Sequence, residues 1–155
     1  MHYIEPATEW DGDGIGLFLA GGISGCANWQ AVAVELLEAT DVVLINPRCN
    51  SFRTDDADAA EAQIRWEHAH LRAAHAILFW FPRETLCPIT LYELGAWSKD
   101  TSKPIFVGTD HAYARKHDVL VQTRLARPAL EVVHSLELVV EQARAWLEGS
   151  ARATK

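Results

Sequence analysis

Six consecutive apolar residues, Ala76-Ile77-Leu78-Phe79-Trp80-Phe81, restrict the possible folds of this chain more than any other segment. An apolar run of this length, with no polar alternation, is typical of a parallel strand that is buried on both faces of its sheet. Parallel strands need crossover connections, which are usually helices. The run therefore predicts an α/β fold.

Short apolar runs alternate with helix-like segments along the rest of the chain. We expect strands at residues 15–20, 42–45, 76–80, 104–107 and 131–134, and helical segments at 28–39, 59–74, 89–99, 111–125 and 136–147. Buried runs separated by helices of this length indicate βαβ units. The predicted architecture is a flavodoxin-like, Rossmann-like doubly wound parallel sheet of five strands in the order 2-1-3-4-5.

The length of 155 residues suits one domain. We expect an N-terminal extension at residues 1–14, a single domain at 15–149 and a C-terminal tail at 150–155. The net charge of −7 argues against binding to nucleic acid, which requires a basic surface. No apolar run approaches the roughly 20 residues that cross a bilayer.

The cysteines and histidines show no metal-ligand spacing. The chain has three cysteines, Cys26, Cys49 and Cys87, and its start lacks the pattern of a secretory signal. An odd number of cysteines without such a signal is typical of a reducing compartment, so we expect a cytoplasmic protein. We expect no metal at the site.

Glu93 follows the buried run at a position where chemistry is expected. Pro88 suits the first position of a helix, and this places Glu93 about one and a half turns into that helix. In open α/β sheets, ligands bind outside the carboxyl ends of the strands. The field of a helix N-terminus favours a carboxylate, so we expect Glu93 to be ionised at pH 7 and able to attack a sugar carbon. Taken alone, Glu93 could equally be a carboxylate that only stabilises the helix start.

Two further strand ends carry candidate binding residues. Gly21, Gly22 and Ile23 follow the first predicted strand, where glycine lets the backbone approach a ligand closely. Their spacing matches neither the dinucleotide fingerprint nor a P-loop. Asn46 and Arg48 follow the second strand and offer an amide and a planar guanidinium. Each feature also fits a purely structural turn.

Glu67 and Trp80 each have two interpretations. Glu67 lies in the middle of the helix before the third strand, and its long side chain could reach the site. It could also be a surface carboxylate beside His70 or Arg72. Trp80 could form a wall against a planar base or belong to the core. His75, directly before the third strand, lies at the far end from the site and is expected to be structural.

Together these segments resemble the nucleoside 2-deoxyribosyltransferases, in particular a bacterial and phage branch of that family. The similarity extends from about Ile15 to Trp146. It is carried by Phe18–Gly21 with Trp29, Ile45–Arg48, Gln63–Glu67, Ala76–Pro82 and Pro88–Gly95, and by the later segments Lys103–Gly108 and Gln122–Pro128.

The resemblance implies an enzyme that cleaves an N-glycosidic bond and transfers the deoxyribosyl group between nucleobases. Glu93 would be the nucleophile at the anomeric carbon C1′, in the manner of a retaining glycosidase. Glu67 is the best candidate for the acid that protonates the leaving base, or for the group that holds the sugar hydroxyls. The remaining residues expected to bind substrate are Gly21, Gly22, Ile23, Asn46, Arg48, Trp80 and Tyr92.

The resemblance also implies partners. The substrates would be a nucleoside or nucleotide and a free nucleobase, and no cofactor is expected. The protein would be a homo-oligomer in which a neighbouring subunit completes the site. The chain departs from the family at His75, where an Asp is frequent, and at Gly21-Gly22, where the branch usually has Gly-Pro.

Two alternatives to the transferase remain open. One is a hydrolase of the same N-glycosidic bond, in a nucleoside or a nucleotide. The other is a non-catalytic nucleotide-binding module that has kept the fold. A flavodoxin-like electron carrier is disfavoured, because the chain lacks an obvious run of Ser, Thr and Gly for a flavin phosphate.

Overall fold

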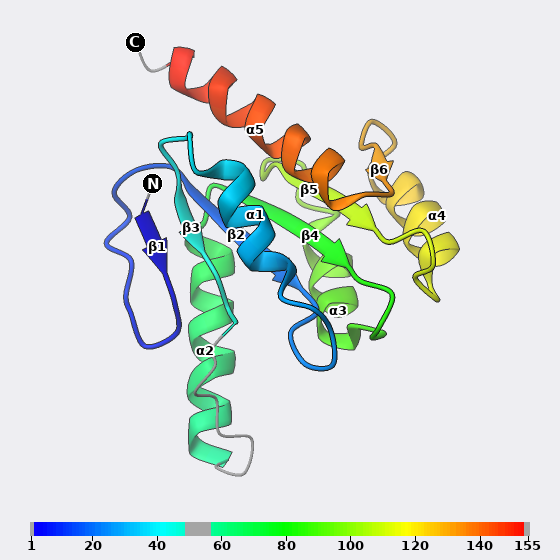
Figure 1. The fold of residues 1–155 in the computed structure, drawn as a ribbon, viewed down its shortest axis with the longest axis horizontal. Coiled ribbons are helices and arrows are strands. Elements are labelled where there is room, and N and C mark those ends of the chain that lie inside the picture. Colours follow the sequence, from blue (N-terminus) through cyan, green and yellow to red (C-terminus); the bar gives the residue numbers. More distant parts are fainter. Residues whose placement is uncertain (1, 49–56, 154–155) are drawn as a thin grey trace.

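The computed structural model describes residues 2–48 and 57–153, and its centre is a parallel sheet of six strands (Figure 1). The strands lie in the order β1-β3-β2-β4-β5-β6. Their bounds are β1 His2–Ile4, β2 Gly16–Gly21, β3 Val43–Ile45, β4 Ala76–Phe81, β5 Ile105–Thr109 and β6 Val132–Val133. The predicted α/β class and the parallel sheet are confirmed.

The predicted count of five strands was wrong, because the N-terminal extension adds a strand. β1 pairs in parallel with β3, with His2 opposite Val43 and Ile4 opposite Ile45. The full order therefore differs from the prediction, although the five expected strands keep the relative order 2-1-3-4-5 within it. β1 is a short, mostly exposed edge strand, so it lacks the apolar run by which the buried strands were found.

The described residues form five helices that cover both faces of the sheet (Figure 1). α1 (Trp29–Leu37) and α5 (Leu136–Ala153) pack on one face, and α2 (Ala57–Ala73), α3 (Pro88–Trp97) and α4 (Lys116–Ala126) pack on the other. α5 is longer than the predicted closing helix. Because both faces are covered, the strands need no polar alternation.

The alternation of side chains along β4 separates two cores. Ile77, Phe79 and Phe81 belong to the cluster that includes residues of α2, α3 and α4. Leu78 and Trp80 belong to the cluster that includes residues of α1 and α5. The face on which a strand residue lies therefore decides which helices it can contact.

Lys103 joins the ends of the two helices that carry the candidate carboxylates. Its Nζ donates hydrogen bonds to the carbonyl oxygens of Leu71 (2.7 Å), Arg72 (2.8 Å) and Ala74 (2.7 Å), at the end of α2. The same Nζ lies 4.4 Å from the ring centroid of Trp97, the last residue of α3. A cation at a helix C-terminus also interacts favourably with the helix dipole.

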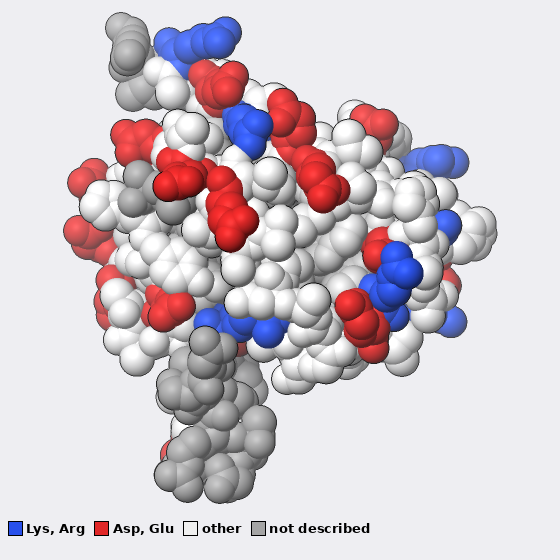
Figure 2. Space-filling model, viewed as in Figure 1, with Lys and Arg blue, Asp and Glu red and all other residues white. Residues whose placement is uncertain are grey.

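On the side of the molecule where α1 and α5 lie, the outer surface carries acidic side chains dispersed among uncharged ones, with few Lys and Arg (Figure 2). No helix within the described ranges has both the length and the apolar character that crossing a bilayer requires.

Candidate active site

The side chains of Glu67, in α2, and Glu93, in α3, are both half-buried on the same face of the sheet. Burial is the main cause that raises the pKa of Glu93 to about 8, and the charge of Glu67 raises it further. Burial also raises the pKa of Glu67. Repulsion between two carboxyls and partial desolvation both favour the state in which one of them is protonated.

The expectation that Glu93 is ionised at pH 7 was wrong for the free protein. A pKa of about 8 leaves this carboxyl mostly protonated at that pH. The sequence argument relied on the helix dipole, whose effect is confined to the first turn. Glu93 is the sixth residue of α3, which starts at Pro88. Desolvation and the charge of Glu67 therefore outweigh the dipole.

Gln63 connects this carboxyl pair to the end of β3. Its Nε2 donates one hydrogen bond to Oε1 of Glu67 (2.7 Å) and another to the carbonyl oxygen of Pro47 (3.1 Å). The bond to Glu67 lowers the pKa of that carboxyl, against the effect of burial. The sequence alone predicts no role for Gln63 at the site. Its contact with Glu67 could have been predicted from their spacing, because residues four apart lie on the same face of a helix.

Arg48 stabilises the glycine turn, Gly21-Gly22-Ile23, at the end of β2. Its Nε donates to Oε1 of Gln30 (2.8 Å), and its Nη2 donates to the carbonyl oxygens of Ala27 (3.1 Å) and Gly22 (3.4 Å). The Gly22 oxygen also accepts hydrogen bonds from Nε1 of Trp29 (2.8 Å) and Nε2 of Gln30 (3.3 Å). The guanidinium is therefore engaged with the protein itself.

Close approach of neighbouring atoms explains the two glycines of the turn. A Cβ on Gly21 would lie 2.5 Å from the carbonyl oxygen of Trp80, and one on Gly22 would lie 2.8 Å from Cγ of Pro82. Ile23, the next residue, is half-buried. The backbone N–H of Gly22 donates to the thiol of Cys87, the residue that precedes α3. This contact attaches the turn to the helix of Glu93.

Asn46 is buried, with 2% of its surface exposed, and both ends of its amide have partners. Nδ2 donates to the hydroxyl of Tyr3, and Oδ1 accepts from the backbone N–H of Arg48 (2.9 Å). The backbone N–H of Asn46 donates to the carbonyl of Ile4 (2.9 Å). Asn46 therefore fastens the edge strand β1 beside the end of β3.

The structure does not bring Trp80 or Tyr92 to the carboxyl pair. Trp80 is only 6% exposed and packs in the core shared with α1 and α5, on the opposite face of the sheet from α2 and α3. Tyr92 is 79% exposed. It is adjacent to Glu93 in the chain, and successive residues of a helix point in different directions.

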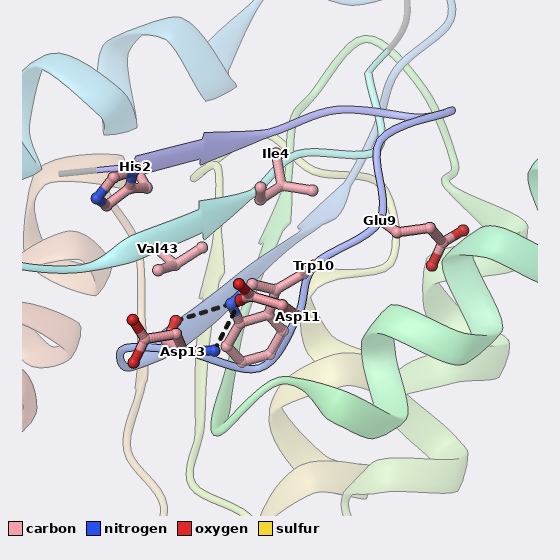
Figure 3. Close-up of a pocket in the computed structure, with 7 residues that line it drawn as sticks. All are labelled: His2, Ile4, Glu9, Trp10, Asp11, Asp13 and Val43. Atoms are coloured by element: carbon pink, nitrogen blue, oxygen red, sulfur yellow. Dashed lines mark hydrogen bonds between the residues drawn. The ribbon is translucent and has the colours of Figure 1, made fainter.

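Two cavities lie elsewhere on the described surface. One, of about 230 Å³, lies beside the edge strand and is lined by His2, Ile4, Glu9, Trp10, Asp11, Asp13 and Val43 (Figure 3). The other, of about 330 Å³, lies between α3 and α4 and is lined by Leu91, Leu94, Gly95, Ser98, Lys99, Asp118, Val119, Gln122, Thr123 and Ala126. Neither cavity is lined by Glu67 or Glu93. The argument for a site at these two carboxyls therefore depends on their chemistry and not on a cavity.

The described residues contain no group of three or more His, Cys, Asp and Glu side chains that could hold a metal ion. What they do contain is a pair of carboxyls with raised pKa values, of which one could be ionised while the other holds a proton. Such a pair can supply a nucleophile and an acid to one reaction. This is the combination that substitution at an anomeric carbon requires.

One comparison with known proteins gave a match. A family model described as nucleoside 2-deoxyribosyltransferase like matches residues 14–112 of the 155. The matched span includes Glu67, Glu93, Gln63 and the glycine turn. A search among curated proteins gave no match.

Proposed function

The chain belongs to the nucleoside 2-deoxyribosyltransferase-like family, and from this premise we propose that it transfers a deoxyribosyl group from one nucleobase to another. The observation that carries the proposal is the half-buried carboxyl pair of Glu67 and Glu93, whose pKa values are both raised. Raised pKa values at paired carboxyls are typical of acid–base and nucleophilic sites.

In the first proposed step, an oxygen of ionised Glu93 bonds to C1′ while the bond between C1′ and the base nitrogen breaks. The proton of the pair, held by Glu67, passes to the leaving base. In the free protein Glu93 holds this proton at pH 7. The proton therefore has to pass to Glu67 before or as the bond to the base breaks, because the positive charge that develops at C1′ during this step favours a carboxylate at Glu93.

In the second proposed step, a ring nitrogen of a second nucleobase attacks C1′ of the sugar ester. The bond between C1′ and Glu93 breaks, and the proton that the incoming base loses returns to Glu67. Two displacements at C1′ retain its configuration. Both carboxyls end as they began, so no cofactor is needed.

The contacts of Arg48 favour a nucleoside over a nucleotide as substrate. A pocket for a 5′-phosphate would need donors near the glycine turn, where Arg48, Ser24 and backbone N–H groups are the candidates. Arg48 already donates to Gln30, Ala27 and Gly22, and the N–H of Gly22 donates to Cys87. The carboxyl pair nearby would also repel a phosphate.

We propose further that the protein acts as a homo-oligomer, as the resemblance implies. The outer face of α3 and the residues before it expose apolar side chains, namely Leu86, Ile89 and Tyr92. Exposed apolar surface of this kind is typical of contact sites. Light scattering coupled to gel filtration of the wild type and of Ile89→Asp tests this contact. A wild-type monomer would contradict it.

Incubation with a panel of deoxynucleosides and their 5′-monophosphates, with and without a second free base, tests the reaction itself. We expect base exchange with nucleosides when a second base is present. Release of free base at an equal rate without an acceptor would instead identify a hydrolase. Binding of nucleosides with neither product would identify a non-catalytic module.

A further inference from the structure

The side-chain amide of Gln63 lies between two acceptors, Oε1 of Glu67 and the carbonyl oxygen of Pro47. We propose that Gln63 is a positioning residue that donates to Oε1 of Glu67, so that Oε2 is the preferred oxygen for the proton given to the leaving base. The catalytic meaning of this proposal rests on the proposed function. The protonation of the Glu67 carboxyl can be measured in the folded protein without measuring enzyme activity.

The contacts of Gln63 fix the orientation of its amide. An amide NH2 has two N–H donors, whereas the carbonyl end can only accept. Because Glu67 Oε1 and Pro47 O both accept, the NH2 end must face both of them, at 2.7 Å and 3.1 Å. The Pro47 carbonyl belongs to a buried backbone segment directly after Asn46. Gln63 is thus anchored on one side and directs its other N–H at Glu67.

This contact suits Glu67 in both protonation states. When Glu67 is ionised, Oε1 accepts a charge-assisted hydrogen bond. When Glu67 is protonated on Oε2, Oε1 becomes the carbonyl oxygen of the acid and still accepts the same N–H. A proton on Oε1 would make this oxygen a hydroxyl, which is a poorer acceptor for the N–H of Gln63 than a carbonyl oxygen. Gln63 therefore favours Oε2 as the oxygen at which the proton leaves and returns.

Through Gln63, Glu67 is also linked to the end of β3 and to the turn at Gly22. Pro47 lies between Asn46 and Arg48, and Arg48 holds the carbonyl of Gly22. A shift of the glycine turn would move Pro47, then Gln63, and so the acid. A precise position matters because proton transfer requires a donor within hydrogen-bond distance of the leaving nitrogen.

Gln63→Met tests the proposal, since methionine has a similar length and no N–H donor. Loss of the donor should raise the pKa of the Glu67 carboxyl by about one unit, because a hydrogen bond to a carboxylate favours its charged form. Carbon-13 NMR of side-chain-labelled glutamate measures this in the folded protein, with Glu67→Gln to assign the signal. We also expect kcat to fall by about 10- to 100-fold with little change in KM.

Gln122→Met, at an exposed position of α4, is the matched control and should titrate like the wild type. In a Glu67→Gln background, Gln63→Met should cause no further loss of kcat, because the oxygen that it positions no longer carries the proton. Gln63→Leu serves as a second variant if the methionine protein folds poorly.

An unchanged Glu67 titration in both Gln63 variants would overturn the proposal. An equal fall in kcat with and without the Glu67 carboxyl would also overturn it, since Gln63 would then only link α2 to β3. The outcome for the proposed function is separate. A wild type that exchanges no base would refute that function, while a shifted titration in Gln63→Met would still support the positioning of Glu67.

Discussion

Glu67 in α2 and Glu93 in α3 are both half-buried, and the charge of Glu67 raises the pKa of Glu93. Desolvation acts in the same direction on both groups. Repulsion between half-buried carboxyls opposes folding. Carboxyls whose pKa values are raised in this way are common at catalytic sites, which is why we propose a catalytic role for this pair.

The pH dependence of the reaction should reflect the single proton of the pair. As pH rises through about 8, Glu93 and Glu67 become a doubly ionised pair with no proton for the leaving base. We therefore expect kcat/KM to fall above pH 8, by about tenfold for each further unit. Initial rates of base exchange between pH 5 and 10 measure this. A rate that is flat to pH 10 would exclude the pair as the source of the proton.

Glu93→Gln should make the protein more stable, and more so at high pH. The pKa of Glu93 in the folded state, about 8, lies above its ordinary value of 4.5. Between these values the folded state binds a proton that the unfolded chain has lost, so the stability of the wild type falls as pH rises. The cost is absent below pH 4.5 and complete above pH 8.

We expect Glu93→Gln to raise the free energy of unfolding by about 1 to 3 kcal/mol at pH 9 and by little near pH 4.5. Urea denaturation at both pH values checks this. The exposed Glu137→Gln in α5 is the control and should show no such difference. Equal stabilisation by Glu93→Gln at the two pH values would contradict the raised pKa.

Glu67→Gln should lower turnover by a factor on the order of 10² to 10⁴, the usual effect of losing a general acid. The loss should depend on the leaving group. A nucleoside whose base departs without protonation, such as one already methylated at a ring nitrogen and positively charged, should recover most of the rate. A loss of the same size for both kinds of substrate would assign Glu67 to the sugar hydroxyls instead.

Lys103→Met should destabilise the fold by about 1 to 3 kcal/mol, because three carbonyl oxygens near the end of α2 lose a charged donor. Lys99→Met, at an exposed position two residues after the end of α3, is the matched control and should change stability by less than about 0.5 kcal/mol. Urea midpoints of both variants give the comparison. Similar midpoints would show that Lys103 is not a structural link.

Much of the fold could be predicted from the chain because its strands are buried on both faces. The run at Ala76–Phe81 has no polar residue, and it forms β4 with those bounds. β1 could not be found in this way, since a three-residue edge strand buries too little apolar surface to leave a pattern. Its pairing depends on tertiary contacts such as that between Tyr3 and Asn46.

The candidate site was only partly predictable. Glu67 and Glu93 could be named as carboxylates near a ligand, and the structure places both half-buried on one face. Their effect on each other could not be predicted, because it arises between two helices and not within one. Trp80 illustrates a further limit. Its place at a strand end suggested a ligand wall, but its side chain lies on the other face of the sheet from α3.

The most direct test of the central claim compares wild type and Glu93→Gln in base exchange, with a deoxynucleoside and the same nucleobase in labelled form. Circular dichroism establishes that both proteins are folded. We predict that the wild type incorporates label into the nucleoside and that Glu93→Gln loses at least about 10⁴-fold of this rate, since no sugar ester can form. Undiminished exchange by the folded Glu93→Gln protein, or none by the wild type with any nucleoside, would contradict the account.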